Sequence, residues 1–245
     1  MLQPQRLALA PNISLGFSDR RAGVSSKPFK SLNMSVARGD SAENVSRNRE
    51  LFLNKMGITE NHLAQPIQIS RDGVGLVDAP GKYENQDALI TDTPGLFLSV
   101  LTADCSPILI WSDKKPLVAA VHSGWQGSEL NILGQTLQKI IETYNIDPAS
   151  LYLVIGPGLS QDNFEVGPEF RAKFADTYLR QLPLSDRYHF NNNQFLVDTA
   201  IQAGLSVEHI EVLPFCTFRD VELFFSHRRD GLKTGRMMSI IGIIK

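Results

Sequence analysis

The sequence predicts an α+β fold with a mixed β-sheet, contained in a single domain over residues 1–245. Apolar residues make up 42% of the chain and charged residues 20%, which is typical of a soluble globular protein. Strand and helix patterns mix along the chain without strict alternation, which favours the α+β class. No repeat, low-complexity tract or linker divides the chain, and 245 residues can bury a core that needs no disulfide.

Short apolar runs bounded by turn residues predict the strands of the N-terminal half. They cover residues 13–18, segments within 67–77, 96–101, 108–111 and 117–121. A helix is predicted over about 42–56, with Asp40 or Ser41 as its cap and Gly57 as its stop. We therefore expect one helix and several strands before residue 122.

The C-terminal half contains the clearest helix, over residues 130–144, where six apolar side chains share one face. Further helices are expected around 168–179 and 198–204. Strands at 151–155, 210–213 and 238–244 complete the predicted sheet.

Cys105 and His122 mark the candidate site. They lie seventeen positions apart, and each stands where a strand pattern stops and a turn begins. Both side chains can therefore point into one cleft at a shared strand end. A thiolate and an imidazole are good zinc ligands, and they also make a nucleophile and base pair, so the residues alone leave both chemistries open. The helix after His122 would favour an anion such as phosphate near its N-terminus.

A second candidate segment is residues 224–231, which hold two aromatics, a histidine and two arginines. Arg228 and Arg229 can bind phosphate or carboxylate in a bidentate manner, or stack on an aromatic ring. The alternative is a solvated turn in which Arg229 pairs with Asp230. The segment is therefore either a binding loop or a structural turn.

Charge and hydropathy exclude several classes of protein. The formal net charge is −2, so no global field favours nucleic acid or an anionic membrane. No run of 18 apolar residues and no secretory signal is present, so we expect a cytoplasmic protein without a membrane span. Cys105 and Cys216 should stay reduced in that compartment. We expect a monomer or a weak dimer.

An ordered series of motifs resembles the laccase-domain family, also called multicopper polyphenol oxidase-like. The series comprises Phe17 to Ser25, Ser31 to Met34, Gly39-Asp40 with Asn48-Arg49, Gln86 to Thr91, Thr102 to Cys105, His122 to Gly127, Ile155 to Pro157, Phe164 to Gly167 and Phe224 to Arg236. The resemblance runs nearly end to end. It implies a layered α/β sandwich related to deamidating toxins of the cytotoxic necrotizing factor type, which use a Cys–His pair without a metal.

The same resemblance implies a zinc-dependent purine nucleoside phosphorylase with adenosine deaminase activity. The family's zinc ligands are a His, a Cys and a His, with one position left open for catalysis. Cys105 and His122 match two of them, whereas the third position holds Ser70. A histidine gained at His227 is a candidate substitute. Multicopper oxidation is set aside, because it needs more histidines than the five present.

Further site roles follow from motif position in the resemblance. Asp104 and Gln126 are expected to shape the rim of the site, and Gln126 stands where the family has arginine. Arg228 and Arg229 are expected to meet phosphate or ribose, and Asn33 to orient a loop of the substrate site. The expected partners are small molecules, a purine nucleoside and phosphate.

Three functions stay open. The first is the family-type enzyme, with zinc held by Cys105, His122 and His227. The second is a metal-free cysteine hydrolase or amidase, with Cys105 as nucleophile and His122 as its base. The third is a degenerate member that binds a nucleoside without turnover, since the family histidine and arginine are replaced by Ser70 and Gln126.

Overall fold

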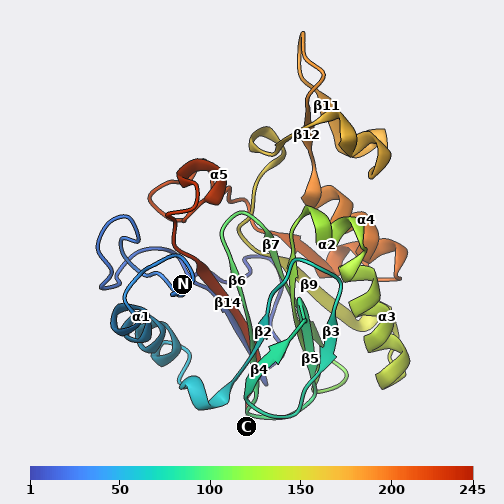
Figure 1. Ribbon diagram of the computed structural model, residues 1–245. Helices are drawn as coiled ribbons and strands as arrows, with labels where there is room; N and C mark the ends of the chain where they lie inside the picture. The colour runs from blue at the N-terminus through green and yellow to red at the C-terminus, as the bar shows by residue number, and fades with distance from the viewer. Residues whose placement is uncertain (245) are drawn as a thin grey trace.

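Two β-sheets stack face to face in the computed structural model, which describes residues 1–244 (Figure 1). The first sheet has the order β1 (Ile13–Phe17), β14 (Met237–Ile243), β6 (Phe97–Thr102), β2 (Leu63–Ile67) and β4 (Gly81–Glu84). The second has the order β13 (Ile210–Val212), β9 (Leu151–Ile155), β7 (Ser106–Ser112), β8 (Val118–Ser123), β5 (Ala88–Thr91) and β3 (Val74–Leu76). Both sheets contain parallel and antiparallel pairs, so the mixed α+β prediction is confirmed.

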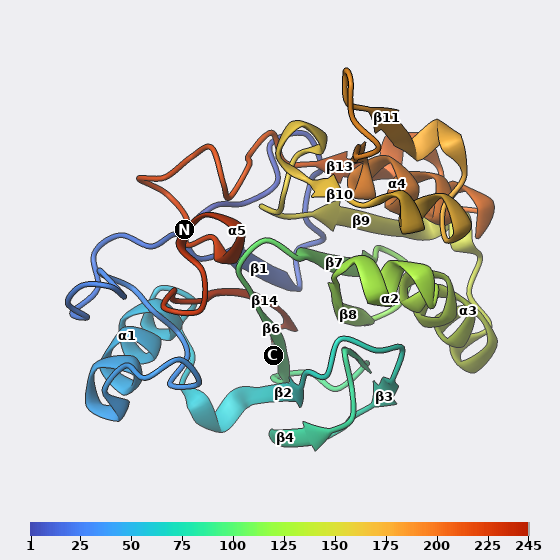
Figure 2. The same ribbon diagram turned by 45° about the horizontal axis from the view of Figure 1, so that its top comes forward.

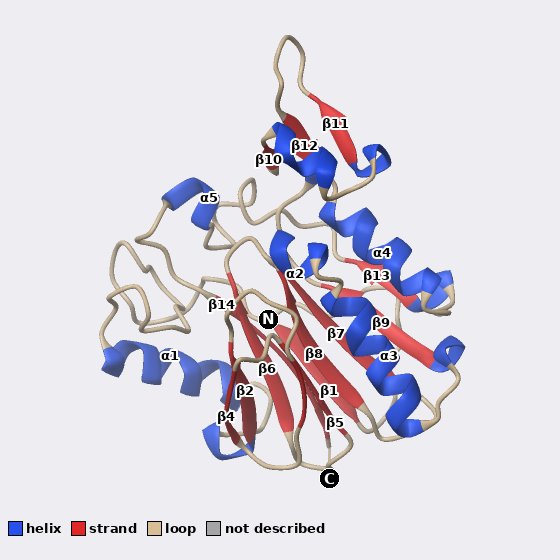
Figure 3. Ribbon diagram, turned by 45° about the vertical axis from the view of Figure 1, so that its right-hand side comes forward, coloured by secondary structure: helices blue, strands red, loops and turns tan. Residues whose placement is uncertain are grey.

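Helices cover the outer faces of the two sheets. Helix α1 (Ala42–Asn54) lies on one side, and α3 (Ile132–Tyr144) and α4 (Asn192–Gln202) lie on the other, as Figure 3 shows. The short helices α2 (Trp125–Glu129) and α5 (His227–Asp230) lie near one end of the sheets. The molecule is therefore layered as helix, sheet, sheet, helix. No helix within residues 1–244 is long and apolar enough to cross a membrane.

Alternating side chains on the central strands fill the spaces between these layers. On β7, Leu109 and Trp111 pack between the sheets, whereas Ile108 and Ile110 pack with residues of α3 and α4. This follows from the period of two along a strand, because both faces of β7 are covered. The strand consequently appears in the sequence as a continuous apolar run.

Helix α1 forms where its cap and its apolar spacing predict it. The Ser41 side chain accepts a hydrogen bond from the Asn44 backbone, and Val45 and Phe52 are buried. Phe52 packs with Met238 and Ile240 of β14 in a cluster of its own. The helix is thus fixed to the outer face of the first sheet.

A small three-stranded unit projects from one end of the molecule (Figure 1). It consists of β10 (Glu165–Val166), β12 (Tyr188–Phe190) and β11 (Leu179–Gln181). The predicted helix over 168–179 is wrong, because residues 168–172 and 176–178 form separate 3₁₀ turns. Phe170 and Phe174 instead pack on Phe190 in a cluster belonging to this unit. Tertiary packing of aromatic rings has overridden helical spacing.

Two other predicted elements differ in extent. The helix expected at 198–204 begins at Asn192, where the Asn191 side chain accepts a hydrogen bond from the Gln194 backbone at 3.1 Å. The loose strand pattern of 67–77 is divided into the end of β2 and the short β3. The intervening loop contains Ser70 with a φ of 58°, a left-handed conformation that interrupts a strand.

Candidate functional site

The loop between β6 and β7 passes from one sheet to the other and carries Asp104 and Cys105. Strand pairing of Ser106 with Ser123 and of Pro107 with His122 places this loop beside the end of β8. Figure 2 shows the connection arching next to α5. Cys105 and His122 are therefore brought together by the antiparallel register of β7 and β8.

Gly124 lies directly against the Cys105 thiol. A Cβ added at residue 124 would lie 2.9 Å from the Cys105 Sγ, closer than real Cβ contacts allow. The absence of a side chain at Gly124 thus leaves room for the thiol in the position it takes.

Asp87, His122 and Cys105 follow one another from the buried interior toward the half-buried thiol. The His122 Nδ1 lies 2.7 Å from the Asp87 Oδ1, and His122 and Cys105 line the same cavity. Asp87 is fully buried and His122 is nearly so, whereas Cys105 is half-buried. An acid, an imidazole and a thiol in this order can orient the ring and activate the sulfur.

Opposing effects act on the pKa of His122. Burial lowers it, but the charge and hydrogen bond of Cys105, together with those of Asp87, raise the pKa to about 9. The pKa of Asp87 is lowered despite its burial, because it accepts hydrogen bonds from His122 and the backbone. The ring is therefore held in its protonated form near neutral pH.

Asp87 also fixes the loop that contains Ser70. Its two carboxylate oxygens accept hydrogen bonds from the backbone N–H groups of Ile69, Ser70 and Arg71, at 3.1, 3.0 and 2.9 Å. One buried carboxylate thus holds both the imidazole and the loop across from it.

Two cavities meet at Cys105. The smaller, which we call the aromatic lobe, has a volume of about 240 Å³ and is lined by Trp125, Phe164 and Leu159 together with polar groups. The larger, the cationic lobe, has a volume of about 560 Å³. Cys105, Ser70, Ala103 and His227 line both lobes. The thiol therefore stands at the junction of two chemically different spaces.

The cationic lobe takes its name from Arg38, Lys82 and Arg236, which line it together with His122. Its lining contains no aspartate or glutamate. These three basic residues come from distant parts of the chain and had no place in the sequence-based site.

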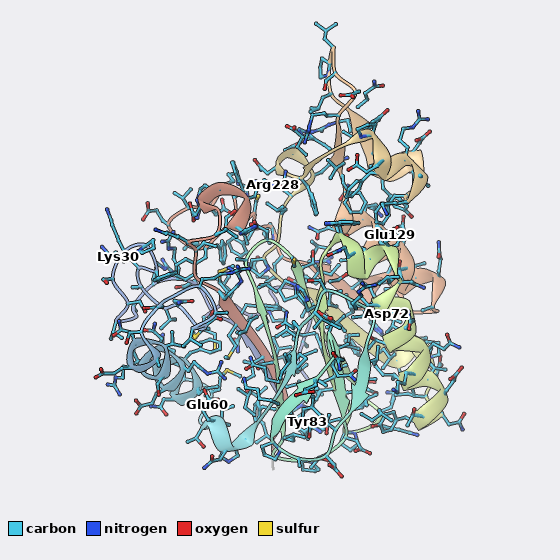
Figure 4. All side chains as sticks on the ribbon, in the orientation of Figure 1. Lys30, Glu60, Asp72, Tyr83, Glu129 and Arg228 are labelled. Carbon is cyan, nitrogen blue, oxygen red and sulfur yellow. The ribbon has the colours of Figure 1, made fainter. Side chains whose placement is uncertain are left out.

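Three predicted substrate residues line the aromatic lobe, namely Asp104, Gln126 and Arg228. Arg228 belongs to α5, and Figure 4 labels it beside that helix, near one end of the sheets. Its guanidinium donates to the Glu165 carbonyl at 2.8 Å and lies 5.7 Å from the centre of the Phe164 ring.

Asp104 has a structural part in the loop as well. Its carboxylate accepts hydrogen bonds from the Thr217 hydroxyl at 2.7 Å and from the Arg228 backbone at 2.6 Å. Its φ of 97° is a left-handed conformation that costs about 1–3 kcal/mol for a residue other than glycine. The surrounding contacts hold this strained turn directly before the thiol.

Arg229 and Asn33 do not line either lobe. The Arg229 guanidinium donates to the carbonyl oxygens of Thr217, Phe218 and Phe224 at 2.9 to 3.0 Å and pairs with Asp230. It therefore ties the loop together from behind.

Asn33 is fully buried. Its Oδ1 accepts a hydrogen bond from the Arg236 backbone at 2.9 Å, and its amide donates to Asp40 at 2.8 Å. It thus positions the backbone at Arg236 without lining either lobe itself.

The donors at the junction do not fit a zinc with three protein ligands. His227 lines both lobes, but its Nδ1 contacts the Gly231 carbonyl at 2.9 Å. Within residues 1–244 no three His, Cys, Asp or Glu side chains are grouped so that they could hold a metal ion. Cys105 and His122 supply two donors, and Ser70 adds only a weakly binding hydroxyl.

The chain is similar over nearly its whole length to proteins of a known family. The sequence profile of a family described as "Multi-copper polyphenol oxidoreductase laccase" matches residues 14–244. The chain belongs to this laccase family. It is 31% identical over 266 residues to "Purine nucleoside phosphorylase" of Bacteroides thetaiotaomicron, covering 100% of this chain and 97% of that protein.

Two further relatives agree with the family assignment. "Purine nucleoside phosphorylase YlmD" of Bacillus subtilis is 31% identical, with 93% of this chain and 87% of that protein covered. The crystal structure of YlmD from Geobacillus stearothermophilus has a TM-score of 0.91 at 27% identity, covering 96% and 93% of the two chains. The layered laccase-family fold is therefore shared over almost the whole length.

Asp87 is the main functional residue that sequence reasoning missed. Its signal was a lone acid directly before the buried run Ala88–Thr91, a place where a charge must find partners. The second cysteine, Cys216, is free and buried and lines neither lobe, and its Sγ accepts hydrogen bonds from Ser160 and Asn163. It has no part in the junction.

Proposed function

We propose that this chain is an enzyme of the purine nucleoside phosphorylase type that acts at the junction of the two lobes. The observation that carries the proposal is the position of Cys105 between an aromatic lobe and a cationic lobe, with His122 lining the cationic lobe beside it. Relatives named purine nucleoside phosphorylase at 31% identity over nearly the full length support it.

The two lobes suit the two halves of a nucleoside reaction. Purine rings stack favourably on aromatic side chains such as Trp125 and Phe164, so the base is placed in the aromatic lobe. Phosphorolysis forms a bond from a phosphate oxygen to C1′ while the C1′–N9 bond breaks and its electron pair stays on the base. His122, held protonated, is the acid at the junction that can neutralise this leaving base.

Zinc and adenosine deamination enter as finer proposals from the family resemblance. A bound zinc would supply an activated water for attack at C6. Because the donors present do not complete a three-ligand set, the phosphorolysis proposed here uses only side chains of this chain.

The test measures release of hypoxanthine from inosine, with and without phosphate, and formation of inosine from adenosine. We expect phosphate-dependent base release that Cys105→Ala and His122→Gln abolish. Cys216→Ala is the matched control, because it removes a thiol that lies outside the junction. Absence of base release from inosine, adenosine and guanosine would contradict the proposal.

Elemental analysis belongs to the same experiment. About one zinc per chain in the purified protein, lost in Cys105→Ala, would mean that another donor completes the site. Activity without zinc would mean that Cys105 and His122 act without the metal.

The Asp87–His122–Cys105 series favours a second candidate, a thiol hydrolase or amidase. The sulfur would attack an acyl carbon, the amine would leave with the proton held by His122, and water would then cleave the thioester. The proposed relation to cytotoxic necrotizing factor-type hydrolases belongs to this candidate. It predicts amide cleavage independent of phosphate and a covalent acyl adduct on Cys105, detectable by mass spectrometry.

A third candidate is a nucleoside-binding protein without turnover. Inosine binding in calorimetry, with no product under any condition, would favour it. Any turnover abolished by Cys105→Ala would exclude it.

We also propose that residues 1–245 act as one domain, as a cytoplasmic monomer or weak dimer that does not bind nucleic acid. Pairing of β1 with β14, near the two ends of the chain, supports the single domain. The two free cysteines agree with a reducing compartment. Size-exclusion chromatography with light scattering tests the oligomeric state.

A further inference from the structure

We propose that the cationic lobe is a subsite for a tetrahedral oxyanion, formed by Arg38, Lys82, Arg236 and Thr102. The inference rests on the proposed function and deepens it by assigning the residues that bind the phosphoryl group. Thr102 and Arg236 lie at the ends of motifs noted in the sequence, but no substrate-binding role was assigned there to any of the four residues.

The first line of support is uncompensated charge. Arg38, Lys82 and Arg236 form no ion pair within residues 1–244, and no carboxylate lines the lobe. The nearby Glu60 is paired with Arg49. Three cations around one cavity without an anion repel each other, and a bound anion relieves that repulsion.

The pKa directions agree with this geometry. Burial lowers the pKa of Lys82, and the positive charge of Arg49 lowers it further. Burial and the neighbouring Arg38 likewise lower the pKa of Arg236. Glu60 raises the pKa of Lys82, and Cys105 and Asp104 raise that of Arg236, but burial and the neighbouring cations outweigh them.

The Arg236 guanidinium retains free donors. Its backbone is fixed by Asn33, and its Nη1 donates to the Gly235 carbonyl at 2.9 Å. Its Nε and Nη2 have no acceptor within the described chain. A guanidinium with two free N–H groups fits two oxygens of a phosphate in a bidentate manner.

Thr102 gives the second, independent indication of a ligand. It ends β6, is 2% exposed and lines the cationic lobe. Its Oγ1 is buried and finds no hydrogen-bond partner among the described residues. Buried hydroxyls are nearly always paired, and an oxyanion in the lobe that Thr102 lines would supply the missing partner.

The cationic lobe is also connected to the aromatic lobe, in which the nucleoside base is proposed to bind. It shares Cys105 and Ser70 with the aromatic lobe, so an oxyanion bound there lies next to the junction. Two sources can supply it, inorganic phosphate as co-substrate or the 5′-phosphoryl group of a nucleotide. Both would use the same four residues.

The experiment is calorimetric titration of the full-length protein with inorganic phosphate, inosine and inosine 5′-monophosphate. Arg236→Gln should weaken binding of the oxyanion at least tenfold, because hydrogen bonds to charged groups are lost. Arg236→Lys should recover part of that loss, and Thr102→Val should weaken binding about threefold or more. Inosine binding should change less than twofold, and thermal unfolding confirms that each variant is folded.

Arg47→Gln is the matched control. It removes the same charge from an exposed arginine that pairs with Glu50 on α1 and lines neither lobe. It should leave the binding of all three probes unchanged.

The titrations with phosphate, inosine and inosine 5′-monophosphate distinguish the two sources of the oxyanion. If inorganic phosphate is the ligand, it binds alone and the nucleotide binds no better than inosine. If the phosphoryl group belongs to the substrate, the nucleotide binds more tightly than inosine and Arg236→Gln removes that advantage. Either result supports the subsite.

Unchanged binding of phosphate and nucleotide in Arg236→Gln, Arg38→Gln and Thr102→Val would overturn the proposal. Phosphorolysis with an unaltered KM for phosphate in these variants would also overturn the subsite, but it would leave the proposed function intact. Oxyanion binding that depends on Arg236 without any phosphorolysis would support the subsite and contradict the phosphorylase.

Discussion

Replacing Asp87 by asparagine tests the centre of this site. The Asp87 Oδ1 accepts hydrogen bonds from Ser70 and His122, and the Oδ2 accepts them from Ile69 and Arg71. Asparagine keeps one acceptor oxygen and puts an amide NH₂ where the second oxygen was. The two donors that contacted the replaced oxygen then face the NH₂ group, which is itself a donor.

The magnitude follows from the bonds that are lost. Two hydrogen bonds to a buried charge are broken, and each contributes about 1.5–3 kcal/mol. The loop around Ile69 and Arg71 is exposed enough for water to replace part of this loss. We therefore expect Asp87→Asn to reduce the free energy of unfolding by about 3 kcal/mol.

The assay is urea unfolding at neutral pH, with activity measured on the same samples. Asp78→Asn is the control, because Asp78 is an exposed carboxylate elsewhere in the chain. We expect less than about 0.5 kcal/mol for that change. Product formation at Cys105 should also fall in Asp87→Asn, since the imidazole loses its orienting partner.

Acid titration adds an independent check. The pKa of Asp87 is lowered in the folded protein below its ordinary value of 3.8, so its contribution to stability is present above that pH. The contribution disappears as pH falls through the lower, folded-state pKa. The difference in free energy of unfolding between the wild type and Asp87→Asn should therefore become smaller on acidification. A gap below about 1 kcal/mol at neutral pH, or one that does not narrow, would refute the role given to Asp87.

Three further predictions concern its neighbours. Gly124→Ala should destabilise the fold by about 1–3 kcal/mol, because the new Cβ would lie 2.9 Å from the Cys105 Sγ. The loss should vanish in a Cys105→Ala background, and a loss that persists there in urea unfolding would contradict the assigned clash. Arg229→Gln should cost about 2 kcal/mol of stability, because backbone carbonyls lose their donors, while calorimetry should show inosine affinity altered less than twofold. Burial lowers the pKa of His122, but Cys105 and Asp87 raise it from 6.5 to about 9. Protonated His122 therefore stabilises the folded state fully below pH 6.5, and this stabilisation is lost as pH rises through about 9. Metal-free protein should therefore lose stability over this interval, and His122→Gln should lose less; equal slopes would speak against the raised pKa.

Local patterns in the sequence were sufficient for most of the elements. The strands β7 and β8 appear as apolar runs because both of their faces are covered by other layers. Helix α1 follows from its cap and its spacing, since both signals act within a few residues. The expected helix over 168–179 failed because Phe170 and Phe174 meet Phe190, a contact that no local signal contains.

The sequence by itself also identified the two side chains proposed to react. Cys105 and His122 stand at strand ends whose antiparallel pairing follows from a short connection, so their meeting is a nearly local event. Tertiary structure decided everything that surrounds them. Asp87 reaches His122 across 35 positions, and Asn33 reaches the Arg236 backbone across 203.

These distant contacts depend on the order of strands and on how the layers stack. Arg38, Lys82 and Arg236 come from three separate segments and share a cavity only because the fold brings the loop of Arg38 and the chain before β14 to the edge strand β4. Hydrophobic periodicity records which face of an element is buried, but not which other element covers it. The proximity of Cys105 and His122 could therefore be expected from the sequence, whereas the cationic lobe beside them arises only from tertiary packing.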